Sequence, residues 1–161
     1  MKTILVALDG SPRASGVLAS AVGLAELTGG KLVLLRAFGL PAEMPQRVWQ
    51  LPEGSLEDVL RHNAQAYLDE IQKTVPPHLL AGTRVGLGSP WQIVCTAARE
   101  EQVDLVVIGA HGFSGLDHIL GTTAAKIVNH IDRSVLVVRD TPPAVTTATQ
   151  VRLPRTTALG A

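Results

Sequence analysis

Two glycine-containing segments of this 161-residue chain carry residue types suited to binding an anion. The first is Leu8-Asp9-Gly10-Ser11. The second runs from Gly109-Ala110-His111-Gly112 to Gly121-Thr122-Thr123. Glycine lets backbone N–H groups come close to a phosphate, and threonine hydroxyls at the start of a helix add further donors. The second segment therefore predicts a phosphate-binding turn.

Asp9 needs a different kind of partner, because a carboxylate repels phosphate. It would face sugar hydroxyls, an exocyclic amine or a divalent cation. Alternatively, Asp9 caps the helix entry at Ser11-Pro12. His111 likewise either donates to a phosphate oxygen or points into solvent. For both residues, the sequence leaves the two alternatives open.

The elements that position these residues follow from the hydrophobic pattern. Short apolar runs alternate with longer segments of helical period, which indicates a parallel sheet covered by helices on both faces. The predicted strands are residues 4–8, 32–38, 83–87, 103–108 and 135–138, of which 83–87 alternates and is expected near an edge. The predicted fold is therefore α/β, a single-domain, open, five-stranded parallel sheet, doubly wound and Rossmann-like. In such sheets ligands bind beyond the carboxyl ends of the strands, so adjacent first and fourth strands would bring the two glycine segments together.

Four helices are predicted from their end signals and apolar periods. Ser11-Pro12 should begin the first and Gly29-Gly30 end it; the others cover residues 55–74, the segment after Ser89-Pro90, and residues 122–130. Their predicted inward residues are Leu56, Leu60, Tyr67 and Ile71, then Ile93, Val94, Ala97 and Ala98, then Ala124, Ile127, Val128 and Ile131. In the proline-rich connection before residue 55, Met44 and Trp49 either cover a bound base or simply pack the loop or a dimer contact.

The composition excludes several classes of protein. Fourteen basic residues balance fourteen acidic ones, so no net field favours nucleic acid. The apolar runs are far shorter than the roughly 20 residues of a membrane span, and Asp9 interrupts any signal-peptide core, so we expect a cytoplasmic protein. Cys95, the single cysteine, is predicted to be a small buried hydrophobe rather than a nucleophile.

The end of the chain differs from the rest. Residues 1–140 are predicted to form the domain, and residues 141–161, rich in threonine and proline, to be flexible or docked on a partner. The last strand, Val135 to Val138, is apolar and is expected at a sheet edge. An exposed apolar edge favours pairing with a second copy, so we expect a homodimer.

Four segments in this order and spacing resemble the universal stress protein family over about residues 2 to 139. They are Ile4 to Ser11, Gly88-Ser89-Pro90, Val103 to Gly112, and Ser134 to Arg139. The resemblance implies a five-stranded parallel domain that is commonly a homodimer joined through its last strand. One branch binds ATP through Gly, two residues, Gly, nine residues, Gly, then Ser or Thr. Here eight residues separate Gly112 from Gly121.

The resemblance also implies roles for single residues. Asp9 would approach the ribose or the adenine, and the backbone at Ala37 would meet the adenine edge. Gly109, His111 and Gly112 would line the phosphates together with Gly121, Thr122 and Thr123. The implied ligand is ATP, or ADP or AMP, with Mg²⁺ held mainly by the phosphates because the sequence has no carboxylate cluster for it.

Three functions follow from this interpretation. The first is a nucleotide-binding regulatory protein of the stress response, a dimeric switch. The second is an enzyme, but the chain lacks a Gly-x-x-x-x-Gly-Lys-Ser/Thr loop and an acid pair near the glycine turn, so at most weak ATP hydrolysis is expected. The third is a nucleotide-free dimeric interaction module. If the shortened segment were helical, losing one residue would turn its direction by about 100°, whereas a loop would absorb the change.

Overall fold

The order of the strands puts the first strand at the centre of the sheet. The computed structural model describes residues 2–39, 55–110 and 120–139. Its strands are β1 (Thr3–Ala7), β2 (Lys31–Phe38), β3 (Leu80–Leu87), β4 (Leu105–Gly109) and β5 (Ser134–Val138). They form one parallel sheet in the order β3-β2-β1-β4-β5. The first and fourth strands are neighbours, which is the condition for the two glycine segments to meet, and the predicted edge position of the third strand is confirmed.

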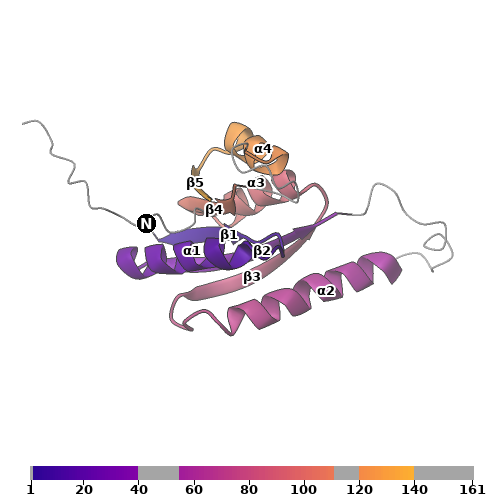
Figure 1. Ribbon diagram of the computed structural model, residues 1–161, viewed down its shortest axis with the longest axis horizontal. Coiled ribbons are helices and arrows are strands. Elements are labelled where there is room, and N and C mark those ends of the chain that lie inside the picture. The colour runs from indigo at the N-terminus through magenta and orange to yellow at the C-terminus, as the bar shows by residue number, and fades with distance from the viewer. Residues whose placement is uncertain (1, 40–54, 111–119, 140–161) are drawn as a thin grey trace, which may run out of the picture.

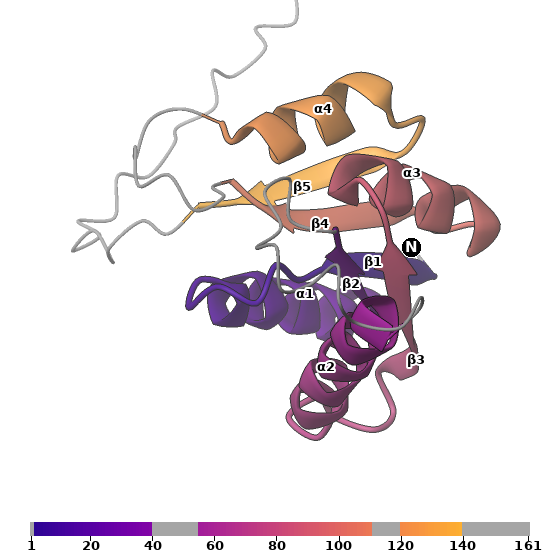
Figure 2. The ribbon, with the colours of Figure 1, turned by 90° about the vertical axis from the view of Figure 1, so that its right-hand side faces the viewer.

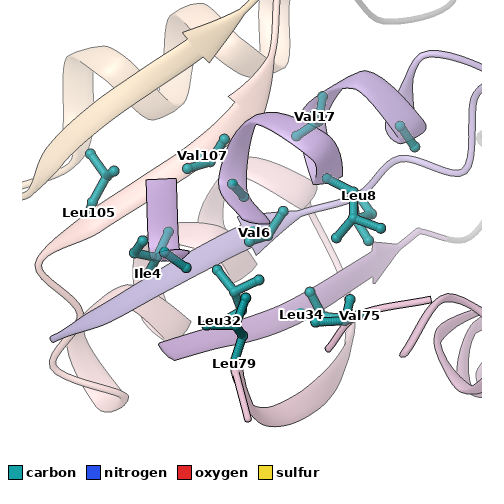
Figure 3. Packing of buried hydrophobic residues seen from close by; sticks show 14 of the residues in the cluster. Ile4, Val6, Leu8, Val17, Leu32, Leu34, Val75, Leu79, Leu105 and Val107 are labelled. Atoms are coloured by element: carbon teal, nitrogen blue, oxygen red, sulfur yellow. The ribbon is translucent and has the colours of Figure 1, made fainter. Parts of the chain in front are cut away.

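Helices cover both faces of this sheet, as Figures 1 and 2 show. They are α1 (Ala14–Thr28), α2 (Ser55–Gln72), α3 (Pro90–Glu100) and α4 (Thr122–His130). The side chains of a strand alternate between faces, so Ile4 and Val6 pack with α1 and α2 while Leu5 packs with α3 and α4. Figure 3 shows the first of these two clusters. The doubly wound, Rossmann-like α/β fold is confirmed.

Several predicted helix ends are also confirmed. Gly29 ends α1 in the left-handed conformation at φ 67°, and the Gly29 and Gly30 N–H groups both donate to the Ala25 carbonyl. Ser89 precedes Pro90 at the start of α3, although the Ser89 side chain makes no capping hydrogen bond. Cys95 on this helix is buried, and burial raises the pKa of its thiol.

Other details of the predicted elements are wrong. Helix α1 begins at Ala14, because residues 11–13 form a turn in which the Ala14 N–H donates to the Ser11 carbonyl at 3.0 Å. Helix α2 buries Ala64 and Leu68, whereas Leu56 and Leu60 are only half-buried. Val128 is 43% exposed, because α4 presents only a narrow stripe, with Ala124 and Ile127 buried. Strand β3 begins at Leu80, three residues before the predicted start.

Some expectations concern residues outside the described ranges. They include Met44, Trp49, His111, Gly112 and the segment 141–161. Among the helices of the described part of the chain, none is both long and apolar enough to cross a bilayer.

Candidate functional site

A cavity of about 500 Å³ lies at the carboxyl ends of β1, β2, β4 and β5. The chain leaves β1 toward α1 on one face and leaves β4 toward α4 on the other, so the connections that follow these two neighbouring strands diverge. This is the topological switch point at which open α/β sheets bind ligands. The cavity volume falls within the usual range for small-molecule sites.

One side of the cavity is the turn that follows β1, residues 8–11, called the β1 turn below. The Leu8 N–H donates to the Leu35 carbonyl at 2.9 Å and extends the pairing with β2. Asp9 lines the cavity, and its Oδ1 accepts a hydrogen bond from the Ser11 N–H at 2.9 Å. Gly10 adopts φ 71°, a conformation that side chains disfavour. Asp9 therefore both orders the turn before α1 and lines the cavity.

The opposite side comes from the end of β4 and the start of α4. The Ala110 N–H donates to the Val138 carbonyl, and the Gly121 N–H donates to the Ala110 carbonyl, each at 2.8 Å. These bonds hold together the two ends of the predicted phosphate-binding segment. The first N–H groups of any helix lack intrahelical acceptors, and Thr123 in the first turn of α4 lines the cavity.

Apolar side chains form most of the remaining wall. They come from both faces of the sheet and from all four helices: Val17, Phe38, Leu60, Val94, Ile108 and Ile127. Ala37 and Gly39 continue this wall at the end of β2. An apolar chamber with a few polar groups at its rim suits a ligand with a flat apolar part and a charged part.

Some of the predicted site residues line the cavity and others do not. Asp9, Ala37, Gly109 and Thr123 line it. Gly121 and Thr122 lie at the N-terminus of α4 but are not among the lining residues. His111 and Gly112 lie outside the described residues.

Two arginines at the cavity were not predicted. Arg13, at the N-cap of α1, and Arg36, on β2, both line it. Arg36 carried a signal in the sequence, because it is a charged residue within the apolar run of the second strand. With Asp9, these residues give the described lining two positive charges and one negative charge. Such a balance favours an anionic ligand.

The described residues contain no group of three or more His, Cys, Asp or Glu side chains able to hold a metal ion.

This architecture is shared by a known protein family. The model of the universal stress protein family matches residues 1–139. The chain belongs to the universal stress protein family. Among curated relatives of this universal stress protein, a putative universal stress protein of Staphylococcus aureus is 29% identical, the match covering 94% of this chain and 95% of the relative.

Solved structures share the fold. The universal stress protein UspA from Lactobacillus plantarum has a TM-score of 0.69 at 24% identity, over 86% of this chain and 97% of that one. A universal stress protein solved in complex with cAMP has a TM-score of 0.57 at 22% identity, over 86% of this chain and 96% of that one. At these identities the likeness concerns the fold.

Proposed function

We propose that this universal stress protein binds an adenine nucleotide in the cavity at the β1–β4 switch point and acts as a nucleotide-dependent regulatory switch. The observation that carries the proposal is the make-up of the cavity. Its wall is mostly apolar, Asp9 and two arginines also line it, and Thr123 from the first turn of a helix reaches it. An adenine base, a ribose and a phosphate chain require these three environments.

Each part of the nucleotide has a proposed partner. The adenine would lie against the apolar wall with its edge at the Ala37 backbone, and Asp9 would accept from a ribose hydroxyl or the adenine amine. The phosphates would lie near Gly109 and the start of α4, with His111, Gly112, Gly121, Thr122 and Thr123 as further partners. Mg²⁺ would be held mainly by the phosphates. A fold relative solved with cAMP supports the choice of an adenine nucleotide.

The segment between Gly112 and Gly121 is one residue shorter than the ATP motif of the family, and the hydrogen bond between Gly121 and Ala110 bears on this difference. The Gly121 N–H donates to the Ala110 carbonyl at 2.8 Å, so α4 begins beside the end of β4. This arrangement supports a working phosphate site despite the shorter spacing.

The switch is proposed to act as a homodimer joined through β5. This strand is the last in the sheet order, so its outer edge has no neighbour among the described strands. Leu136 on this strand is 38% exposed. An apolar edge strand is readily paired by a second copy. The same edge would support a nucleotide-free interaction module if the cavity bound no nucleotide.

Replacing Gly109 tests the position of the site. A Cβ at Gly109 would lie 3.4 Å from Val17 Cγ2 at the cavity wall, so the larger Gly109→Val side chain would occupy space needed by the ligand. We expect ATP affinity in the presence of Mg²⁺, measured by calorimetry, to fall at least about 100-fold, or about 2.7 kcal/mol. The matched control is Gly82→Val on edge strand β3, where an added Cβ has no neighbour within 4 Å.

Unchanged ATP affinity in the folded Gly109→Val protein would contradict this placement of the ligand. Mass spectrometry of the small molecules released by denaturing the purified protein gives an independent test. If no nucleotide is released, and the wild-type protein takes up no ATP with Mg²⁺, the nucleotide proposal is wrong and the dimeric interaction module is favoured.

A further inference from the structure

Arg36 occupies an unusual place for a charged residue. It lies within β2, two residues after buried Leu34 and on the same face of the sheet, where the core cluster beneath α1 and α2 is otherwise apolar. Its side chain is half-buried at the carboxyl end of the strand and lines the cavity. Placing a guanidinium on such a face costs desolvation, so its contacts must supply compensation.

Those contacts hold the β1 turn. Arg36 Nη1 donates to the Leu8 carbonyl at 3.1 Å. A Cβ built on Gly10 would lie 2.8, 2.9 and 3.0 Å from Nη2, Cζ and Nη1 of Arg36, so Gly10 faces the flat side of the guanidinium. A side chain at residue 10 would displace the Arg36 guanidinium, and it would also have to adopt the positive φ. The turn that carries Asp9 thus contacts Arg36 on both sides of Asp9.

Tyr67 of α2 also contacts the guanidinium of Arg36. The Arg36 Cζ lies 5.3 Å from the centre of the Tyr67 ring, within the range of a cation–π contact. Burial raises the pKa of the Tyr67 hydroxyl, the Arg36 charge lowers it, and the Asp9 charge raises it. Both charges are therefore close enough to act on the same side chain. Strand β2 and helix α2 together hold the guanidinium in one place.

We propose that Arg36 is a positioning residue for the nucleotide. It holds the β1 turn from Leu8 to Gly10, and so directs the Asp9 carboxylate into the cavity. Its charge also offsets that of Asp9 where a phosphate-bearing ligand would enter. This inference rests on the proposed function for its ligand, but the ordering of the turn by Arg36 does not depend on a ligand.

A double-mutant cycle tests whether Arg36 acts through Asp9. The proteins are wild type, Asp9→Asn, Arg36→Met and the double variant, each titrated with ATP and Mg²⁺ by calorimetry. Arg36→Met keeps an unbranched side chain of four heavy atoms and removes the guanidinium with its charge and N–H donors. We expect Arg36→Met to lower ATP affinity about tenfold when Asp9 is present. When Asp9 is already replaced by asparagine, we expect the same substitution to lower affinity by less than about twofold. Additive losses, or no loss in Arg36→Met, would overturn the inference.

Arg36→Lys separates position from charge. Lysine retains the positive charge but lacks the planar group that meets Gly10 and Tyr67. We expect this variant to lose nearly as much affinity as Arg36→Met, and wild-type affinity would refute a positioning role. Arg61→Met is the matched control, because Arg61 is an exposed arginine of α2 that pairs with Glu57 at 2.9 Å. Its ATP affinity should match that of the wild type.

A ligand-free measurement distinguishes failure of this inference from failure of the proposed function. The Ser11 amide donates to Asp9 Oδ1, so its hydrogen exchange by NMR reports whether the turn is ordered. In Arg36→Met without nucleotide we expect this exchange to accelerate about tenfold. If exchange accelerates in a protein that binds no ATP, the role of Arg36 is supported and only the proposed nucleotide binding is contradicted. Unchanged exchange would overturn the role of Arg36.

Discussion

Asp104 joins the start of β1 to the loop before β4. Its Oδ2 accepts hydrogen bonds from the backbone N–H groups of Lys2 at 2.6 Å and Thr3 at 3.0 Å. The bond from Thr3, followed by the bond from Lys2, holds the pKa of the Asp104 carboxyl below its ordinary value. A carboxyl group whose pKa is lower in the folded state stabilises that state above its ordinary pKa.

Replacing this carboxylate should make stability less dependent on acidic pH. The contribution of Asp104 is present at neutral pH and is lost as pH falls through the lowered pKa, below the ordinary value of 3.8. We therefore expect Asp104→Asn to lower the urea midpoint at pH 7 and to approach the wild-type midpoint near pH 3. Urea titrations at several pH values check this. A difference between the two proteins that stayed constant from pH 7 to pH 3 would contradict it.

At the scale of single residues, the sequence located the cavity but not all of its charges. Asp9 and Gly109 could be predicted to share a site only on the condition that the first and fourth strands are neighbours, which the structure shows. Arg36 was not singled out, although it is a charged residue within an apolar strand. A long side chain that reaches from a sheet face to a neighbouring turn leaves no periodic signal. Its role depends on Gly10 and Tyr67, which are distant in sequence.

The effect on stability of adding a methyl group at a glycine depends on the helix or strand that contains it. A Cβ at Gly86 of β3 would lie 2.3 Å from Ile93 Cγ2 of α3, whereas a Cβ at Gly23, inside α1, would have no neighbour within 4 Å. We expect Gly86→Ala to destabilise the protein by about 1–3 kcal/mol, because Ile93 or α3 must shift. Gly23→Ala should stabilise it by about 0.5–1 kcal/mol, because alanine loses less backbone entropy in a helix.

Urea unfolding of both glycine variants beside the wild type measures these changes. The two variants should change stability in opposite directions, although both substitutions add the same methyl group. Unchanged stability in Gly86→Ala would show that α3 does not pack closely on β3 at this position. A loss of stability in Gly23→Ala would contradict the open space beside α1.

At the scale of elements, the signals with a local physical cause were reliable. Helix α4 covers the predicted residues 122–130, and Gly29 ends α1 as expected. The start of α1 was wrong because Ser11 can serve either as a helix cap or as part of a turn. Here Asp9 binds the Ser11 N–H, and the helix begins later. Tertiary packing also decided which residues α2 buries, and the helical period alone could not specify that choice.

The two outer strands of the whole molecule are β3 and β5, and only the second is proposed to pair with another copy. We expect the protein to sediment as a dimer at micromolar concentration and Leu136→Arg to sediment as a monomer, because the charge would be buried at the interface. The matched control is Leu27→Arg on α1, where leucine is 87% exposed. Its sedimentation should match that of the wild type.

A wild-type protein that sediments as a monomer would contradict the proposed dimer. Dissociation by Leu27→Arg rather than by Leu136→Arg would place the interface on α1 instead. Analytical ultracentrifugation with and without ATP also tests whether nucleotide occupancy alters the assembly, as a dimeric switch requires.

The central place of β1 has a consequence for how the chain is synthesised. Ile4, Leu5 and Val6 pair on one side with β2, but their partners on the other side are Leu105, Val106 and Val107 of β4. During translation these apolar residues leave the ribosome about a hundred positions before those partners. One edge of β1 therefore stays unpaired until β4 has been synthesised. Such edges are prone to aggregate. The topology therefore keeps one apolar edge of the nascent sheet open until β4 emerges.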